Sequence, residues 1–401
     1  MTTVTASDLR EIEDLLAEPV AAAAERERTT FAEQLRAGDG TVVLFGAGRL
    51  GQLCARALAR AGVPLRAFCD GNSRLQSTTV AGVEVLAPAD AARRFGGALF
   101  VVAIWTGTAR ESMPERVAFL RGLGCAHVTS YAPLVWAHGA EEAPFHAFDL
   151  PSRTLAAAAP LRALAAHLGD DASRRVFLAA LRQRLRGDFD PAPPVADQYF
   201  PADLVRLGRG ETFVDGGAFD GDTLADFLRR VGGEFRHYHA FEPDAANSER
   251  LRQRIAALES PLRAKITHHP VALHAAASAL AFSDQGGTTS QLQATGTAEV
   301  RGEALDTVIG DGAVSFLKLD VEGAELAALR GAARILRTQR PLVAACVYHR
   351  PEDLWTVPEF ILEAMPASRL YLRRHGWDGW ETVGYVLPQE RARPEGTVPV
   401  P

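Results

Sequence analysis

Cysteine and lysine are scarce in this sequence, and long apolar runs are missing. The four cysteines show no C-x-x-C spacing and lie in apolar stretches, so we expect reduced thiols, no disulfide and no zinc site. Only two of the 43 basic residues are lysines and none form a dense block; at a net charge of −6, we expect no nucleic-acid partner. The most apolar stretches, 97–105 and 154–168, are too short or broken by Arg162, so we expect no membrane span.

The N-terminal segment does not resemble an export signal. Asp8 and Glu11 stand where such a signal needs cations followed by an apolar run. We therefore expect a cytoplasmic protein.

The rest of the composition is that of an ordinary globular chain. With 401 residues and 47% hydrophobic residues, it is long enough for two to three domains of about 150 residues each. A proline cluster in 188–201 indicates a domain boundary. We predict a helical lead-in (1–38), a Rossmann-like α/β domain (39–150), a helical connector with a proline-rich linker (151–201) and a larger α/β domain (202–401).

Hydrophobic periodicity predicts alternating strands and helices in both α/β domains. The first part is predicted to contain helix 5–37, strand 41–45, a helix to 61, strands 65–69 and 98–104, helix 110–121, strand 127–130 and helix 152–186. The second is predicted to contain strands 212–215, 238–242, 266–273, 315–320 and 341–348, helices 223–231, 245–258, 324–336 and 355–365, a hairpin at 280–289 turning at 284–287, and an antiparallel pair, 369–374 with 381–387. Such repeats predict an α/β fold with a doubly wound parallel sheet and an antiparallel edge.

A glycine-rich loop after the strand at 212–215 has the pattern D-x-G-x-x-x-G, from Asp215 to Gly221. Its glycines allow close approach of a ligand, and the helix that follows offers free N–H groups to an anion. Glu242, after the next strand, can accept both ribose hydroxyls of an adenosine. Asp215 beside a sulfonium or amino group favours S-adenosyl-L-methionine, whereas a plain turn with Asp222 as N-cap is the structural alternative.

Four further segments carry a longer pattern: Phe241-Glu242-Pro243, the stretch from Phe316 to Glu325, Leu329-Arg330-Gly331-Ala332, and the stretch from Cys346 to Trp355. With Gln198-Tyr199-Phe200 before them and Glu381-Thr382-Val383 after them, they resemble the FkbM family of S-adenosylmethionine-dependent methyltransferases over about 190 residues. The resemblance implies a class I methyltransferase-like sheet and O-methylation of a hydroxyl of a sugar, glycan, glycolipid or related natural product. It implies these cofactor-binding residues: Tyr199, Asp215, Gly216, Gly217, Gly221, Thr223, Glu242 and Asp320.

Methyl transfer to an alcohol needs alignment and a base. The carboxyl ends of the fourth and fifth parallel strands supply the catalytic candidates Asp320, Glu322 and His349, with His349 as the general base. A hydrogen-bonded structural role for His349 is the alternative. For Glu325 we prefer the role of a charged residue in the first turn of a helix, and Lys318 is either a paired cation or a pocket residue. The histidines at 237, 239, 268 and 269 lack the carboxylates of a metal site, so no metal is expected.

A second glycine loop, Gly46-x-Gly48-x-x-Gly51 with Asp70 after it, lies in the first α/β domain and matches a dinucleotide fingerprint. It is similar to small domains that precede some FkbM methyltransferases and sugar acyltransferases. No Tyr-x-x-x-Lys pair is present, which excludes a short-chain dehydrogenase. A docking, substrate-presenting or oligomerising unit is preferred here over a nucleotide site.

Two functions therefore remain open. The first is a methyltransferase with a small-molecule or glycan acceptor, assembling with copies of itself where the first domain oligomerises. The second is a non-catalytic module that binds S-adenosylmethionine and a nucleotide or nucleotide sugar. A nicotinamide-dependent oxidoreductase would need a hydride-acceptor site, and the sequence suggests none.

Overall fold

The structure is a computed structural model that describes residues 6–141, 145–283, 291–292 and 298–391. The chain divides into two compact units. The N-terminal unit comprises 1–165, 174–194 and 376–381, and the C-terminal unit comprises 166–173, 195–375 and 382–401. One crossing between the units follows Pro194, inside the proline-rich segment.

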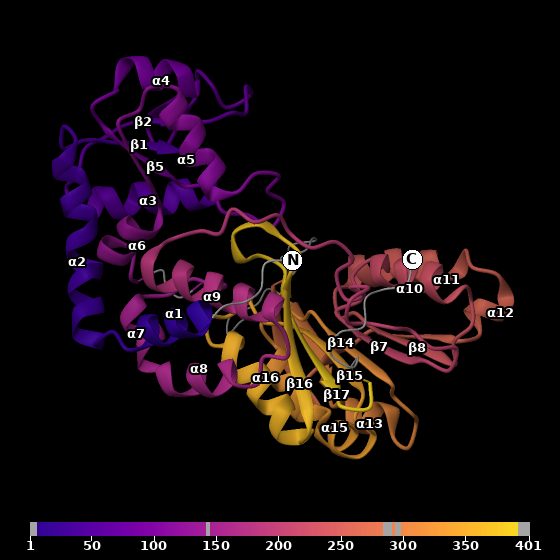
Figure 1. Ribbon diagram of the computed structural model, residues 1–401. Helices are drawn as coiled ribbons and strands as arrows, with labels where there is room; N and C mark the ends of the chain where they lie inside the picture. Colours follow the sequence, from indigo (N-terminus) through magenta and orange to yellow (C-terminus); the bar gives the residue numbers. More distant parts are fainter. Residues whose placement is uncertain (1–5, 142–144, 284–290, 293–297, 392–401) are drawn as a thin grey trace. The chain divides into compact units, whose positions relative to one another are not determined.

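The N-terminal unit is built on a six-stranded sheet in the order β3-β4-β2-β1-β5-β6. Neighbouring strands are parallel except β3 and β4, and β1 occupies a central position between β2 and β5. The strands are β1 Val42–Phe45, β2 Leu65–Cys69, β3 Thr79–Val80, β4 Val83–Leu86, β5 Leu99–Val102 and β6 His127–Ser130. The helices are α1 Ala6–Leu16, α2 Val20–Ala37, α3 Arg49–Arg60, α4 Pro88–Arg94, α5 Met113–Gly122, α6 Ala132–His138, α7 Pro151–Ala156, α8 Ala158–Ala165 and most of α9 Asp171–Arg186. The predicted Rossmann-like α/β alternation is thus confirmed (Figure 1).

The two long helices predicted in this part of the chain are interrupted. Helix 5–37 is α1 and α2, because Pro19 takes an extended conformation at the N-cap of α2. Helix 152–186 is divided into α7, α8 and α9. Strands β3 and β4 with helix α4 were not predicted as elements.

A buried ion pair ties the late segment 376–381 to the N-terminal unit. The Arg116 Nη1 lies 3.2 Å from Asp378 Oδ2, and Asp378 also accepts a hydrogen bond from the Met113 backbone at the start of α5. Both charged side chains are almost fully buried, so solvent barely reaches this ion pair.

The C-terminal unit is built on a seven-stranded sheet in the order β16-β17-β15-β14-β7-β8-β9. Strands β9, β8, β7, β14 and β15 are parallel, and β17 runs antiparallel between β15 and β16. The strands are β7 Thr212–Gly216, β8 His237–Phe241, β9 Ile266–His269, β14 Phe316–Leu319, β15 Leu342–Cys346, β16 Ser368–Arg374 and β17 Thr382–Pro388. The predicted doubly wound sheet with an antiparallel edge is confirmed. The strand order reverses between β7 and β14, and ligands bind at such a reversal at the carboxyl ends of the strands.

Helices cover both faces of this sheet. In Figure 1, α10 and α11 lie along one side and α15 and α16 along the other. The helices are α10 Asp222–Val231, α11 Ala245–Ala256, α12 Ser260–Arg263, α13 Leu305–Ile309, α14 Glu325–Gly331, α15 Ala333–Gln339 and α16 Asp353–Ala364. The predicted single helix 324–336 is α14 followed by α15.

A second, four-stranded sheet in this unit has the order β10-β13-β11-β12, with β10 Ala272–Leu273, β11 Ser278–Ser283, β12 Gln291–Leu292 and β13 Ala298–Glu303. The predicted strand 266–273 is wrong as one strand, since Pro270 lacks a backbone donor and the chain leaves β9 to enter β10 in the other sheet. The strands flanking the predicted hairpin, β11 and β12, pair antiparallel, and its predicted turn at 284–287 lies outside the described residues.

An aromatic cluster holds the centre of the large sheet. The Phe213 ring on β7 lies 4.7 Å from the Phe316 ring on β14 and 5.1 Å from the rings of Phe227 on α10 and Tyr238 on β8, measured between centroids. All four side chains are buried. The strands that end at the glycine loop are therefore fixed in position by packing.

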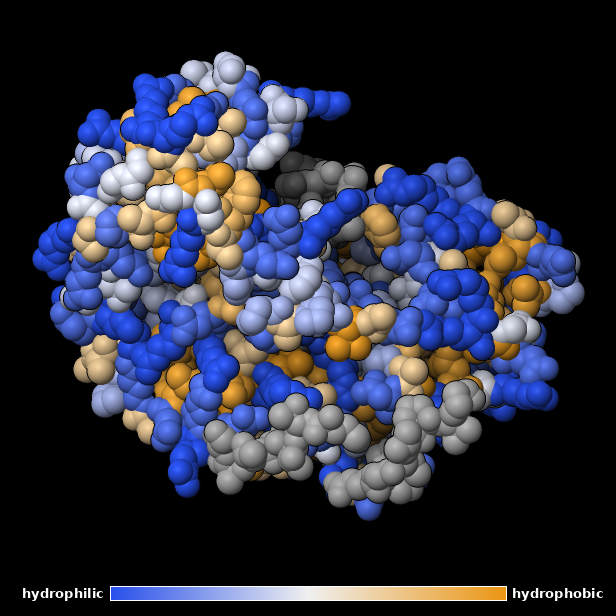
Figure 2. Space-filling view, turned by 45° about the horizontal axis from the view of Figure 1, so that its top comes forward, coloured by the Kyte–Doolittle hydropathy of each residue, from blue (hydrophilic) through white to orange (hydrophobic). Residues whose placement is uncertain are grey.

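The surface drawn in Figure 2 is mainly hydrophilic, with hydrophobic residues in separate groups. Large hydrophobic side chains that are exposed include Leu9, Val20, Phe119 and Val195. Among the described residues, no helix combines the length and apolarity that a membrane crossing requires.

Candidate functional site

The glycine loop between β7 and α10 lies against the end of β14. Gly217 has a φ of +78°, and a Cβ there would lie 1.8 Å from the Asp320 carbonyl oxygen. Gly216 ends β7, and its carbonyl accepts a hydrogen bond from the Asp320 backbone at 3.0 Å. Gly221, with a φ of +88°, is the N-cap of α10, so the expected N-cap Asp222 is instead the first residue of the helix. The Asp222 Oδ1 accepts from the Thr223 N–H at 2.6 Å. Side chains at 217 and 221 would collide with their neighbours, which accounts for glycine at both positions.

Glu242, at the carboxyl end of β8, faces the same loop. Its Oε2 accepts from the Phe219 N–H at 2.8 Å and its Oε1 from the Asp244 N–H at 2.9 Å. Burial raises the pKa of Glu242 to about 7, although these hydrogen bonds favour the carboxylate. The structure thus brings Glu242 to the glycine loop.

Asp215 lies behind the loop as part of a buried ion pair. Its Oδ1 is 2.9 Å from Lys318 Nζ, and its Oδ2 accepts from the Tyr238 hydroxyl at 2.5 Å. Asp215 is 0% exposed, so no atom of it reaches solvent or a ligand in this conformation. Direct contact of Asp215 with a ligand's sulfonium or amine stays a prediction.

Lys318 is the paired cation of the two alternatives, and it also holds the loop. Its Nζ donates to the Gly217 carbonyl at 2.6 Å and lies 5.0 Å from the centre of the Tyr199 ring. Burial lowers the pKa of Lys318, but the carboxylates of Asp215 and Asp320 outweigh burial and raise it. Asp215 and Lys318 are direct neighbours in the β7–β14 register, so this pairing can be recognised only once the sheet order is known.

Asp320, directly after β14, is held from two sides. Its Oδ2 accepts from the Tyr199 hydroxyl at 2.6 Å, and its Oδ1 lies 3.4 Å from His349 Nε2. Burial raises the pKa of Asp320, but the charges of Lys318 and His349 outweigh it and leave the pKa below its ordinary value. Asp320 is therefore an ionised carboxylate, and its side chain stays partly exposed.

His349, after β15, stands among three carboxylates. Its Nδ1 lies 2.8 Å from Glu325 Oε1, and its Nε2 lies 3.7 Å from Glu322 Oε2 and close to Asp320. Burial lowers the pKa of His349, but these acids together raise it to about 10. A protonated imidazole has no lone pair for a substrate proton, so the general-base role expected for His349 stays a prediction that requires its proton to leave first.

Glu325 is the site residue that the sequence analysis undervalued. It lies in the first turn of α14, as expected, but it is 0% exposed, and its Oε1 also accepts from the Val321 N–H at 3.0 Å. The helical pattern of 324–336 gave no signal that the end of β15 would bring His349 to this side chain. Nearby Asp353 is also buried, and burial and the charge of Glu325 raise its pKa to about 8.

Donor atoms of Asp320, Cys346 and His349 lie within 4.8 Å of one another, which is close enough to hold a metal ion. The positive charge of His349 opposes a second cation there, and a site without metal stays our prediction. The four histidines of β8 and β9 instead make hydrogen bonds among themselves and with hydroxyls, as in the 3.2 Å contact between His239 and His269. Burial lowers the pKa of both of these histidines to about 4.

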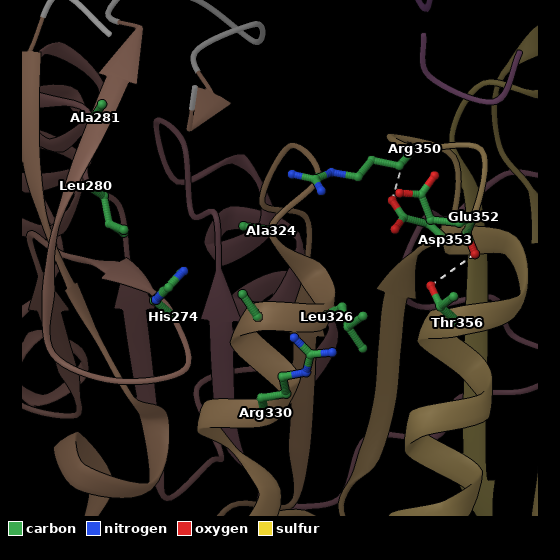
Figure 3. A pocket seen from close by; sticks show the side chains of 12 residues that line it. His274, Leu280, Ala281, Ala324, Leu326, Arg330, Arg350, Glu352, Asp353 and Thr356 are labelled. Atoms are coloured by element: carbon green, nitrogen blue, oxygen red, sulfur yellow. Dashed lines mark hydrogen bonds between the residues drawn. The ribbon is translucent and has the colours of Figure 1, made fainter. Parts of the chain in front are cut away.

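A cavity of about 400 Å³ opens beside these groups in the C-terminal unit (Figure 3). Gly323 and Ala324, which follow Glu322, form part of its wall, as does Arg350, which follows His349. Leu280 and Ala281 of β11 and Leu326 of α14 supply apolar surface. The cavity thus lies beside the acidic cluster formed by Asp320, Glu322 and Glu325.

The glycine loop of the N-terminal unit is closely packed except at one position. A Cβ at Gly46 would lie 2.6 Å from the Ile104 side chain, and one at Gly51 would lie 2.0 Å from the Gly46 carbonyl oxygen, whereas a Cβ at Gly48 would meet no atom within 4 Å. Asp70 Oδ2 accepts from the Ala47 N–H at 2.9 Å. Asp70 therefore ties the loop to β2, and a nucleotide site here stays a prediction.

Comparison with known proteins points to one family. Residues 215–376 match the family model described as the methyltransferase FkbM domain. The crystal structure of methyltransferase FkbM from Methylobacillus flagellatus KT aligns with 92% of this chain and 98% of that chain, at 23% identity and a TM-score of 0.74, which shows a shared fold. The methyltransferase domain of bacterial CtHen1-CN aligns with 45% of this chain and 91% of that chain, at 13% identity and a TM-score of 0.29. No curated protein matches the sequence.

Proposed function

From the match of residues 215–376 to the methyltransferase FkbM domain, we propose that the chain transfers a methyl group from S-adenosyl-L-methionine to a hydroxyl of a sugar, glycan, glycolipid or related natural product. One observation carries the proposal: the backbone of Asp320, a residue with an ionised carboxylate, packs against Gly217 of the glycine loop at the reversal point of the sheet. The loop suits a cofactor and the carboxylate suits an acceptor.

The residues around the loop fit the cofactor we propose. Glu242 would accept the ribose hydroxyls, and the backbone of Gly216, Gly217 and Gly221 with Thr223 would surround the methionine end. Tyr199 and Asp320 would close the site on the β14 side, where Tyr199 already donates to Asp320. When bound, S-adenosylmethionine supplies a methyl group on a positively charged sulfur, which a hydroxyl oxygen can attack as the carbon–sulfur bond breaks.

The chain itself would take the proton that the hydroxyl loses. We assign this role to Asp320, with Glu322 as its neighbour, because both carboxylates are partly exposed and lie within 3.7 Å of His349 Nε2. His349, fixed through Nδ1 by Glu325, would hold Asp320 in place and keep it ionised.

The test is methyl transfer itself. The full chain is incubated with methyl-labelled S-adenosylmethionine and a library of glycosides and nucleotide sugars, and products are identified by mass. We expect a singly methylated hydroxyl product, with Asp320→Asn and His349→Ala lowering kcat far more than KM. The first variant removes the carboxylate that takes the acceptor's proton in the transition state, and the second removes the side chain that positions this carboxylate. Rates within about threefold of wild type would remove both from catalysis.

Binding of S-adenosylmethionine without transfer to any acceptor would favour the alternative, a non-catalytic module. For the N-terminal unit we propose docking, substrate presentation or self-association, since its glycine loop is held by Asp70. We propose a cytoplasmic location for the whole chain, together with the division into lead-in, Rossmann-like domain, connector and methyltransferase domain.

A further inference from the structure

The cavity beside the acidic cluster is lined by two arginines from different elements. Arg330 comes from α14, and Arg350 follows β15. Resting on the proposed function, we propose that this cavity binds an oxyanion of the methyl acceptor, a carboxylate or a phosphate, and that the acceptor is therefore an acidic or phosphorylated hydroxyl compound.

Both guanidinium groups are available to a ligand. Each residue is exposed, and within the described part of the chain neither guanidinium has a hydrogen bond or an ion pair. Arg373 of the same unit is engaged by contrast, since it pairs with Asp170 and Asp203 at 2.6 Å. Figure 3 shows both guanidinium groups extending toward the middle of the cavity, with His274 on the opposite wall. Two such groups facing one space match the geometry with which arginine binds carboxylate and phosphate.

The acids of the cavity only partly offset this positive charge. Asp353 is buried, its Oδ2 accepts from the Arg350 backbone N–H at 2.8 Å, and burial raises its pKa to about 8, so it is mostly neutral at pH 7. Glu352 is the remaining acid on the wall. Two arginines against the one remaining acid leave the cavity with a net positive charge, which favours an anion over a neutral group.

The position of Arg350 connects this charge to the proposed chemistry. A Cβ at Gly323 would lie 2.9 Å from Arg350 Nε, so the arginine side chain lies over the glycine that follows Glu322. Gly323 has a φ of +91°, a conformation that glycine adopts without strain. An anion bound by Arg350 would thus lie next to the loop that carries Asp320 and Glu322, where the hydroxyl must be held.

The experiment uses matched sets of acceptors that share one hydroxylated ring: a neutral glycoside, its uronate and its phosphate. Methyl transfer by the full chain is measured with each. We expect the uronate or the phosphate to exceed the neutral member by about tenfold or more in kcat/KM, as a charge-assisted bidentate contact would give. The better of the two anions identifies the source of the oxyanion.

Two variants and one control locate the effect. Arg330→Gln and Arg350→Gln should each lower kcat/KM for the anionic acceptor by about tenfold and leave that for the neutral member unchanged. Arg337→Gln changes an exposed arginine of α15 outside the cavity and should have no effect. Equal use of neutral and anionic acceptors, or unchanged kinetics in both cavity variants, would overturn the proposal.

Calorimetry separates this proposal from the proposed function. S-adenosylhomocysteine should bind the wild type and both cavity variants with equal affinity, since neither arginine lies at the glycine loop. If S-adenosylhomocysteine does not bind the wild type, the proposed function fails. Titration of the wild type and Arg350→Gln with glucuronate and glucose 6-phosphate then still tests the cavity: no arginine-dependent binding of either would overturn the oxyanion site.

Discussion

Replacing Glu242 with alanine tests the cofactor placement most directly. In the structure its two oxygens each accept one backbone N–H, from Phe219 and Asp244, and each oxygen can accept a further hydrogen bond. If these accept ribose hydroxyls, the variant should lose about 1 to 3 kcal/mol of binding free energy, or about 5- to 150-fold in Kd. Calorimetric titration with S-adenosylhomocysteine measures the loss.

The protonation of Glu242 adds a second, independent signature. Burial raises its pKa to about 7, so the carboxylate is about one-tenth ionised at pH 6 and about nine-tenths ionised at pH 8. Binding that needs the carboxylate should therefore weaken by about tenfold from pH 8 to pH 6. The neutral variant Glu242→Gln should lack this component of the pH dependence.

The control is Glu249→Ala, which removes a half-exposed acid of α11 that pairs with Arg252 away from the loop. Its affinity and pH dependence should match those of the wild type. An alanine variant at 242 that binds within about twofold of wild type, or equal pH dependence in Glu242→Gln and wild type, would refute the placement of the ribose at this residue.

Three further predictions concern the framework of the two units. Lys318→Met should lower the free energy of unfolding by about 3 to 5 kcal/mol in urea titrations, because Asp215 would remain buried without its counter-ion. Adding Asp215→Asn should restore part of the lost free energy, and strictly additive losses from the two changes would contradict this pairing. The pKa of His349 is raised to about 10, so its charge stabilises the fold fully below about pH 6.5, and this stabilisation is lost as the pH rises through 10. Glu325→Gln should flatten that fall in the free energy of unfolding, and parallel pH curves for the variant and the wild type would contradict the pairing of Glu325 with His349. Gly51→Ala should lower the free energy of unfolding by about 1 to 3 kcal/mol, and Tm with it, because the new Cβ would collide with the Gly46 carbonyl. Gly48→Val should keep its Tm and abolish any thermal shift that nucleotide sugars produce in wild type; no shift in wild type would leave the loop as a turn.

The sequence predicted elements best where local chemistry alone decides them. Strands β2 and β6 have the predicted bounds, and the antiparallel pair β16 and β17 is where alternation placed it. Two of the errors occur at prolines: Pro19 separates α1 from α2, and Pro270 ends β9. The division of helix 324–336 into α14 and α15 involves no proline. A pattern of apolar residues reports burial along one segment but not where that segment changes its partner.

The site was predicted in part for the same reason. Glu242 and Asp320 follow strands directly, so the rule for strand ends was enough to place them. Glu325 and Lys318 owe their roles to neighbours distant in the sequence, His349 and Asp215, and pairing of this kind depends on sheet order. The charge of His349 could not be predicted either, because it arises from three acids that meet only in the folded chain.

The close approach of Gly217 to Asp320 has a consequence for how this protein can change. Because Lys318 binds the Gly217 carbonyl and lies two positions before Asp320, a shift of β14 would displace the loop and the carboxylate together. Substitutions at these positions should therefore be epistatic, so that one tolerated alone is harmful beside another. On the proposed function, acceptor preference would be free to diverge at Arg330 and Arg350, whose side chains lie outside this coupled set.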